Sequence, residues 1–380
     1  TEPKLNVIRF TPYSNPSLPR MLGLALKLLS LLYHLFNILW NLSFDCILVQ
    51  NPPSIPLLSL SLFYPCVIID WHNLGYTMFD TKLLRHVCYY YEQWFCRYGR
   101  GHFTVTAAMK SWLTTKFLIG SSNGGDAGEV VILRDCPAEF FHRTTDVERE
   151  ELLTRLDSEA VLPSKTVLQL RDTTSKTKSM LCISSTSYTP EEDFGILLSS
   201  LVKIDSKLSQ TTSNVSFSNL IVIVTGKGPL KQYYADQISA LRLSHVQIHQ
   251  VWLSASDYPL LLGMADVGIS LHTSTSGIDL PMKVLDMFGC EVPVISVFYD
   301  TIHELVVKDE NGWVVKDIEE LTHCLKNLLM VQKGGKCRDT VLESMRANIR
   351  KNILSKRWNE NWNEAALPLI QSVCLKCTKH

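Results

Sequence analysis

Two groups of residues in this sequence have types and spacing that suit chemistry at the edge of a sheet. In the first, Asp70 and His72 follow directly after the apolar run Cys66–Ile69. A carboxylate and an imidazole this close can form a general base and its neighbour. Trp71 and Asn73 stand beside them, and an indole ring suits stacking on a sugar. The structural alternative is that Asp70 and His72 cap the next helix.

The second group lies in the stretch HTSTSGIDLPMKVLDMFGCEVPVISV, which begins at His272. Gly277 lets the chain turn tightly and expose backbone N–H groups. Pro281 fits the first position of a helix, because the N–H that it lacks would have no partner there. Such a helix start can hold a diphosphate without a metal ion. Lys283 adds a charge in the first turn, and Asp286 can accept hydrogen bonds from a ribose diol. The structural alternative is an ordinary loop–helix–strand unit.

A glycine turn, Thr225-Gly-Lys-Gly-Pro-Leu, follows the apolar run Leu220–Val224 and leads into a helix. It repeats the anion-holding geometry, although a GxG motif by itself has low specificity.

Strands that alternate with helices predict parallel sheets, whose ligands bind beyond the carboxyl ends of the strands. The predicted strands are Cys46–Val49, Cys66–Ile69, 102–106, Glu129–Leu133, Met180–Ile183, Leu220–Val224, 246–253, 266–271, Pro293–Val297 and Trp313–Val315. The predicted helices include 54–63, 81–98, Ala107–Phe117, one that opens at Thr189, 257–264, about 281–289 and one that begins at His303.

The 380 residues allow two domains with sizeable cores, and the zero formal charge argues against a nucleic-acid partner. Residues 143–179 are polar with few apolar anchors, which predicts a surface insertion or linker. It separates a first domain, 1–142, from a second, 180–350. Residues 351–380 are expected to form a helical tail that packs back on the body.

Eleven cysteines without a framework spacing favour a reducing compartment. Cys374 and Cys377 form one CxxC pair, which lacks the second pair that a zinc site needs, so no metal ligand is assigned.

Residues 21–42 are the most apolar segment and are long enough to span a bilayer. Steps of three, four, three and four gather its polar residues on one stripe of a helix. They are Lys27, Ser30, His34, Asn37 and Asn41. The stripe favours a helix at the membrane interface. A buried core helix and a membrane span are the alternatives.

Longer runs of the chain resemble the chitobiosyldiphosphodolichol β-mannosyltransferase family. They are VTGKGPL from Val224, DYPLLLGMAD from Asp257, HTSTSGIDLPMKVLDMFGC from His272, QNPP from Gln50, IDWHNLGY from Ile69 and SSTSYTPEEDF from Ser184. The likeness covers the chain roughly from residue 20 to residue 370.

The resemblance implies an α/β fold of glycosyltransferase-B type, with two Rossmann-like parallel-sheet domains facing a cleft. It implies transfer of the first mannose from GDP-mannose to dolichyl-diphospho-N,N′-diacetylchitobiose in a β1,4 linkage, for protein N-glycosylation. The implied location is the cytosolic face of the endoplasmic reticulum membrane, with other dolichol-pathway mannosyltransferases as candidate partners. No cofactor is assigned from the sequence, and it does not decide whether a divalent ion assists. Inversion of an α-linked donor needs a base for the acceptor hydroxyl and a stabiliser for the departing GDP.

The resemblance also places the site residues. The donor-binding residues that it implies are Ser185, Thr186, Gly226, Lys227, Gly228, Trp252, Leu253, Ser276, Gly277, Asp279, Lys283, Asp286 and Glu304. Within this set, Ser185 and Thr186 would donate hydrogen bonds to phosphate, and Trp252 and Leu253 would flank the guanine.

In the wider fold family an acidic pair brackets the helix start. The second acid aligns here as Asp286, and the first as Ser276 or Asp279. Asp70 or His72 is the candidate base, and Trp71 and Asn73 are the candidate acceptor contacts.

The chain departs from the family pattern in two places. The family begins with a membrane anchor and a first strand–loop–helix that carries a glycine-rich loop, so this sequence is expected to start inside the first domain, with an exposed sheet edge. Arg134-Asp-Cys-Pro stands where the family carries a basic residue just before the proline.

Two other functions compete with the transferase. One is a non-catalytic membrane-surface scaffold for partner glycosyltransferases. The other keeps the fold and changes the donor, as in an N-acetylglucosaminyltransferase, and the run around Pro281 argues against it.

Overall fold

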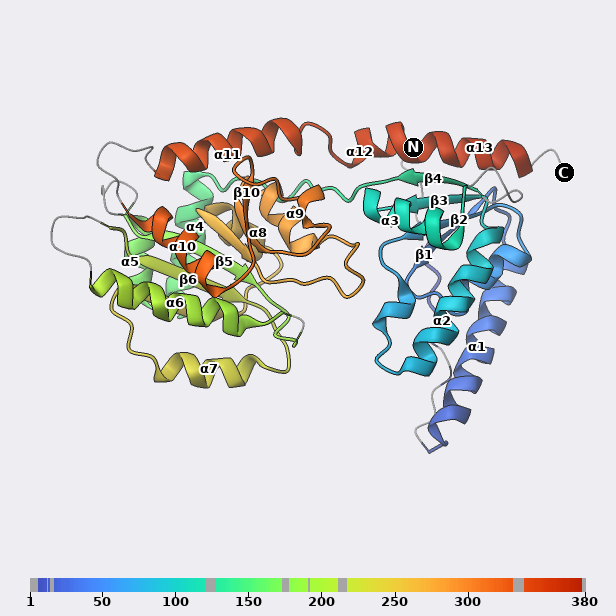
Figure 1. The fold of residues 1–380 in the computed structure, drawn as a ribbon, viewed down its shortest axis with the longest axis horizontal. Helices are drawn as coiled ribbons and strands as arrows, with labels where there is room; N and C mark the ends of the chain where they lie inside the picture. Colours follow the sequence, from blue (N-terminus) through green and yellow to red (C-terminus); the bar gives the residue numbers. More distant parts are fainter. Residues whose placement is uncertain are drawn as a thin grey trace. The chain divides into compact units, whose positions relative to one another are not determined.

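The computed structural model describes residues 6–11, 13, 17–120, 128–172, 178–190, 192–210, 217–330 and 338–377. The chain forms two compact units, each built on a parallel sheet (Figure 1). Unit 1 comprises Thr1–Thr104, Met109–Ile132 and Ala365–His380, and unit 2 comprises Val105–Ala108 and Leu133–Glu364.

Unit 1 holds a four-stranded parallel sheet in the order β1-β2-β3-β4. The strands are β1 (Ile47–Asn51), β2 (Val67–Trp71), β3 (Gly101–Thr104) and β4 (Glu129–Ile132). Its helical elements are α1 (Arg20–Trp40), the 3-10 helices η1 (Leu57–Leu62), η2 (Gly75–Met78) and η3 (Cys96–Tyr98), α2 (Lys82–Phe95), the π-helical turn η4 (Leu113–Phe117) and α13 (Leu367–Cys377). Helix α3 (Ala107–Trp112) begins in unit 2 and ends in unit 1.

The four strands of this unit lie within one or two residues of their predicted positions, because the buried strands of a parallel sheet read as continuous apolar runs. The helix predicted over 54–63 is instead the 3-10 helix η1.

Helix α1 exposes its apolar side. No residue of its most apolar stretch, within Leu22–Trp40, is buried, and the side chains of Leu29, Tyr33 and Trp40 are 62%, 68% and 87% exposed. Its polar stripe faces the N-terminal segment, since Ser30 accepts a hydrogen bond from the Tyr13 N–H. These exposures rule out the buried core helix. By length and composition, α1 could cross a membrane.

The C-terminal helix α13 belongs to unit 1. It packs on β3, where Leu369 lies against Gly101. Cys377 at its end forms a disulfide with Cys66 at the start of β2. The scattered cysteine spacing did not predict this bond, because its partners are 311 residues apart in sequence.

Unit 2 holds a six-stranded parallel sheet in the order β10-β9-β8-β5-β6-β7. The strands are β5 (Met180–Ser185), β6 (Leu220–Thr225), β7 (Val246–Val251), β8 (Val267–Ser270), β9 (Val294–Val297) and β10 (Gly312–Val315). The helices are α4 (Asp146–Ser158), α5 (Ser164–Arg171), α6 (Phe194–Ser209), α7 (Lys231–Ala240), α8 (Asp257–Met264), α9 (Met282–Gly289), the 3-10 helix η5 (Ile302–Glu304), α10 (Ile318–Leu329), α11 (Arg338–Asn352), α12 (Trp358–Asn361) and η6 (Trp362–Ala366), a π-helical turn that reaches into unit 1.

The prediction of a linker over 143–179 is wrong. Helices α4 and α5 occupy this stretch, and Leu152, Leu153 and Leu156 of α4 are at most 2% exposed in the core of unit 2. Thr145 starts α4 with a capping box. A single buried stripe is enough to dock an otherwise polar helix, so average composition hid it.

Two helix starts also differ from prediction. The helix expected at Thr189 begins at Phe194, with Asp193 as its N-cap, because the side chain of Glu192 folds back to bind Thr186 and the Ser187 N–H. The helix expected at His303 is the short 3-10 helix η5. Helix α9 begins at Met282, directly after Pro281 and close to its predicted start.

Candidate functional site

The sheet of unit 2 reverses its strand order between β5 and β8. From β5 the chain proceeds through β6 to β7 on one side, and from β8 through β9 to β10 on the other. In doubly wound α/β sheets the ligand crevice lies at this switch point, outside the carboxyl ends of the strands. The loops after β5, β6 and β8 therefore define the candidate site.

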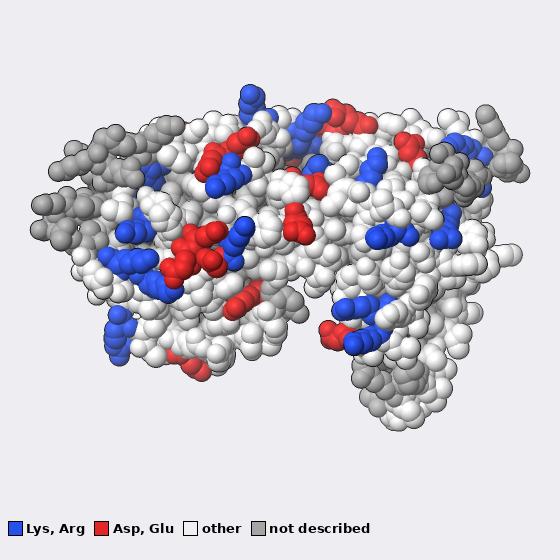
Figure 2. Space-filling model, viewed as in Figure 1, with Lys and Arg blue, Asp and Glu red and all other residues white. Residues whose placement is uncertain are grey.

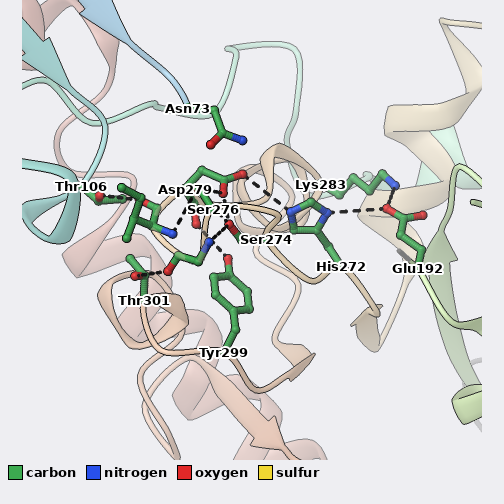
Figure 3. Close-up of polar contacts among 12 residues, drawn as sticks. Asn73, Thr106, Glu192, His272, Ser274, Ser276, Asp279, Lys283, Tyr299 and Thr301 are labelled. Atoms are coloured by element: carbon green, nitrogen blue, oxygen red, sulfur yellow. Dashed lines mark hydrogen bonds and ion pairs between the residues drawn. The ribbon is translucent and has the colours of Figure 1, made fainter. Parts of the chain in front are cut away.

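Glu192 lies at the centre of this site. Its side chain is 5% exposed and forms an ion pair with Lys283 of α9 (Figure 3). The same carboxylate accepts hydrogen bonds from the Thr186 hydroxyl at 2.8 Å and the Ser187 N–H at 2.6 Å. Glu192 thus ties the loop after β5 to the start of α9.

His272, which follows β8, lies between two carboxylates (Figure 3). Its Nδ1 is 3.9 Å from Glu192 and its Nε2 is 3.8 Å from Asp279. Burial lowers the pKa of His272, but Asp279 and Glu192 outweigh it and raise the pKa to about 9. The imidazole is therefore a cation at neutral pH. Lys283 and His272 form a pair of positive charges balanced by two carboxylates.

The loop that carries Asp279 is held by hydrogen bonds on several sides (Figure 3). The hydroxyls of Ser274 and Ser276 donate to the Asp279 carboxylate. Tyr299 donates to the Asp279 carbonyl at 3.1 Å, and Thr301 to the Gly277 carbonyl at 2.6 Å. Burial raises the pKa of Asp279, but His272 and the serine hydroxyls together lower it by more, so the net shift is downward. The loop presents a fixed anion beside a fixed cation.

Gly277 has a φ of 76°, and a Cβ placed there would meet no atom within 4 Å. The backbone conformation, rather than crowding, therefore requires glycine at this position.

Gly226 and Gly228 allow close packing between two loops of the site. A Cβ on Gly226 would collide with the Thr186 carbonyl, and one on Gly228 with the Ser187 carbonyl. The two glycines let the loop after β6 lie directly against the loop after β5. Between them, Lys227 places its ammonium 3.8 Å from the ring centroid of Trp252, whose side chain is 54% exposed.

The carboxylate of Asp286, in α9, makes no hydrogen bond or ion pair with the described part of the chain. Burial raises the pKa of this carboxyl to about 6. The hydroxyl of Tyr258 contacts Ser185 at 3.0 Å. Burial raises the pKa of Tyr258 to about 12, and the nearby Asp286 carboxylate adds to that increase. A buried carboxylate without a protein partner is available to accept hydrogen bonds from a ligand.

Three predicted donor contacts are wrong at the level of the side chain. Thr186 is 4% exposed, and its hydroxyl already donates to Glu192. Leu253 is 7% exposed and packs in the core. Glu304 accepts hydrogen bonds at 2.8 Å from both Ala107 and Ala108 N–H groups and pairs with Arg134, so both of its carboxylate oxygens already bind protein groups.

In unit 1, Asp70 and His72 are brought together as expected. Asp70 Oδ2 lies 3.0 Å from His72 Nε2, and the two side chains are 19% and 33% exposed. This contact can orient the imidazole as a general base, or the carboxylate itself can accept the proton. Asn73 uses its side-chain oxygen to accept the Leu74 N–H.

The expectation that Trp71 stacks on a sugar is wrong. Its side chain is 0% exposed, and its indole N–H donates to His102 Nδ1 at 3.2 Å. Successive strand residues point to opposite faces of the sheet, so the ring beside Asp70 points into the core.

Glu192 and His272 are the site residues that sequence reasoning did not assign. His272 stands directly after a predicted strand, which was an available signal, whereas Glu192 falls within the helix expected to open at Thr189. Their pairing depends on β5 and β8 being neighbours in the sheet, and the sequence does not state that order.

The chain is similar to known proteins in both sequence and fold. A profile of the family described as Glycosyl transferases group 1 matches residues 169–348. Among solved structures, WaaG, a glycosyltransferase involved in lipopolysaccharide biosynthesis, aligns with a TM-score of 0.61 at 12% identity, over 98% of this chain and 86% of that chain. The predicted glycosyltransferase-B fold is thereby confirmed.

Two relatives are closer in sequence. The chitobiosyldiphosphodolichol beta-mannosyltransferase of Homo sapiens is 35% identical over 93% of this chain and 78% of its own length. A protein of Arabidopsis thaliana named UDP-glycosyltransferase TURAN is 37% identical over 87% of this chain and 77% of its own length. The chain belongs to the chitobiosyldiphosphodolichol β-mannosyltransferase family and is a hexosyltransferase.

Proposed function

We propose that the chain transfers mannose from GDP-mannose to dolichyl-diphospho-N,N′-diacetylchitobiose. The product is a β1,4 linkage, made at the cytosolic face of the endoplasmic reticulum membrane during assembly of the lipid-linked oligosaccharide for protein N-glycosylation. The observation that carries the proposal is a pair of cations, Lys283 and His272. They lie where the strand order of the unit 2 sheet reverses, in a chain that belongs to this transferase family.

The donor diphosphate binds beside Lys283 and His272 and the first N–H groups of α9. In the free protein both cations are paired with carboxylates, so the site is near neutral before the donor arrives. Negative charge grows on the departing GDP as the glycosidic bond breaks, and fixed positive groups lower the free energy of that transition state.

The nucleoside has two further contacts. The Asp286 carboxylate accepts hydrogen bonds from the ribose diol, since no described residue uses it. Lys227 and Trp252, which lie together on the surface, offer a flat and positively charged support for the guanine.

On the acceptor side, the Asp70–His72 pair takes the proton from the attacking hydroxyl. A single in-line displacement on the α-linked donor then gives the β product. No cofactor is assigned to the reaction. The membrane and other dolichol-pathway mannosyltransferases are the proposed partners.

The test is mannosyl transfer by the purified, folded chain. Radiolabelled GDP-mannose is mixed with a phytanyl-diphosphate chitobiose acceptor, and parallel reactions contain UDP-glucose or UDP-N-acetylglucosamine. We expect lipid-linked trisaccharide from GDP-mannose alone. The UDP-sugars are included because one relative is named a UDP-glycosyltransferase. Transfer only from a UDP-sugar would contradict the proposed donor, and no transfer from any donor would favour the scaffold.

A further inference from the structure

A cavity of about 440 Å³ lies in unit 1 between the loop after β1, η2 and the middle of α2. Its volume falls within the range of roughly 300–1,000 Å³ that is typical of small-molecule sites. Carbon atoms of Pro52, Pro53, Ile55, Met78 and Phe79 make up much of its wall. None of these residues belongs to the site described above.

The hydroxyl of Ser54, a residue that lines the cavity, is bound by another side chain of the protein. The hydroxyl of Ser54 donates to Glu92, whose side chain is 0% exposed and also accepts a hydrogen bond from Asn51. Gly75 brings no side chain, and a Cβ there would collide with that same hydroxyl. Cys88, at 2% exposure, is a weak donor. A polar ligand would leave its hydrogen-bonding groups unpaired here, whereas a hydrocarbon would lose nothing.

Large apolar side chains are also exposed on η2 and on the face of α2 that points away from Cys88. Met78 is 61% exposed. Beyond it, α2 exposes four large apolar residues at steps of four, three and four, which places them on one helix face. They are Leu83, Val87, Tyr90 and Trp94, with side chains 71%, 52%, 62% and 59% exposed. A stripe of this kind is typical of a surface that meets lipid.

The cavity is also tied to the strand end that carries the candidate base. The Asn51 carbonyl accepts the His72 N–H at 2.9 Å, and the Asn51 side chain donates to the Asn73 carbonyl at 3.2 Å. The next residues along the chain, Pro52 and Pro53, form part of the wall. One end of a ligand in the cavity would therefore lie close to the strand end that carries Asp70 and His72.

We propose that this cavity binds the hydrocarbon chain of the lipid-linked acceptor, at the end next to its diphosphate. The inference rests on the proposed function, because a lipid-linked acceptor is what makes a hydrocarbon available beside the candidate base. The chain would enter past Met78, which lines the cavity and is exposed. Binding there would hold the acceptor sugar at the strand end.

Photolabelling tests the site directly. The probe is a diphosphate-linked chitobiose whose isoprenoid chain carries a diazirine near the diphosphate. We expect the label on peptides that contain residues 52–55 and 75–88, with competition by phytanyl-diphosphate chitobiose and none by phosphatidylcholine vesicles. Label confined to other peptides would overturn the proposal. Equal competition by phosphatidylcholine would overturn it too, by assigning the cavity to membrane lipid instead.

A kinetic test uses Met78→Glu, which places a charge at the mouth of the cavity. We expect the KM for the phytanyl-diphosphate acceptor to rise about tenfold or more, since burying a charge against hydrocarbon is unfavourable, while the KM for GDP-mannose is unchanged. Leu118→Glu is the matched control, because Leu118 is a 58% exposed apolar residue of unit 1 that does not line the cavity. Equal acceptor KM values in the two variants would refute the proposal.

The two tests separate this inference from the proposed function. If the wild-type chain transfers no mannose, the function fails, yet the photolabel still reports whether the cavity holds an isoprenoid. If the wild type transfers mannose and neither Met78→Glu nor the photolabel gives the expected result, the function stands and the lipid site fails.

Discussion

At the scale of single residues, the positive charge of His272 depends on its two carboxylate neighbours, Asp279 and Glu192. Its raised pKa of about 9 means that the positive charge is present below that pH and is lost as the pH rises through it. GDP binding should therefore weaken between about pH 8 and pH 10. His272→Asn should lose about tenfold in GDP affinity at pH 7, which corresponds to about 1.4 kcal/mol.

Calorimetric titration of GDP at several pH values checks this expectation. The His272→Asn variant should show a flatter pH dependence than the wild type, because it has no imidazolium to lose. The matched control is His323→Asn, which changes a histidine on the separate helix α10 and should leave both the affinity and its pH dependence unaltered. The same pH dependence in wild type and His272→Asn would show that His272 does not carry the anion-binding charge.

Variants of the remaining polar residues should fall into two groups, one that weakens GDP binding and one that lowers turnover. Lys283→Ala and Asp286→Ala should weaken GDP binding, because one removes a cation and the other a ribose acceptor. Asp70→Asn or His72→Ala should lower turnover by about 10²–10⁴-fold and leave GDP affinity intact, as loss of a general base does. Equal GDP affinity in all four variants would contradict the division.

At the scale of elements, Glu92 of α2 joins the loop after β1 to η2 from within the core of unit 1. Burial raises the pKa of its carboxyl to about 7, although hydrogen bonds from Ser54 and Asn51 oppose the shift. The folded state then holds a proton that the unfolded chain releases near the ordinary pKa of 4.5. Its contribution to stability is complete below the unfolded pKa and is lost as the pH rises through the folded pKa.

Glu92→Gln should remove the loss of folding stability at high pH, because the amide has no proton to release. We expect the variant to exceed the wild type in free energy of unfolding by about 1–3 kcal/mol at pH 8, with a smaller difference at pH 5. Urea unfolding at both pH values measures it. Glu129→Gln, at an exposed position of β4, is the control and should show no such pH dependence. A constant difference between the two pH values would contradict the assignment of the proton to Glu92.

Helices and strands can be predicted from this sequence more accurately than side-chain contacts. Strands such as β6 were placed because buried parallel strands are continuous apolar runs, and Pro281 marked the start of α9. Helix α4 was missed because only three leucines of a charged segment reach the core. Among site residues, Lys283 was recognised from its place in the helix start.

The errors at the site have a different cause. Trp71 is predicted from its place beside Asp70 and Leu253 from the family resemblance, but the side of a strand or loop that faces the core is set by tertiary packing. Glu304 was assigned from the family pattern, whereas two N–H groups almost two hundred residues away bind its carboxylate. Hydrogen-bond partners at such separations follow from topology, which local patterns do not contain.

At the scale of the whole molecule, the zero net charge conceals an asymmetry. Unit 1 contains twelve Lys and Arg against seven Asp and Glu, which leaves +5, and unit 2 carries the balancing −5. On the face drawn in Figure 2, unit 1 shows mostly white and blue residues and few red ones. The same unit carries the exposed apolar helix α1. A positive, apolar unit is suited to an anionic lipid surface.

Flotation with liposomes tests this expectation. The chain should float with vesicles, more completely when they contain an anionic lipid, and added salt should remove only that increment, because screening acts on charge and not on apolar burial. Replacing Leu22 and Leu29 of α1, which are 49% and 62% exposed, by serine should reduce the bound fraction by about tenfold or more. The matched control replaces Leu168 and Leu375, exposed leucines outside α1, by serine. Equal flotation of the two double variants would show that α1 is not the membrane contact.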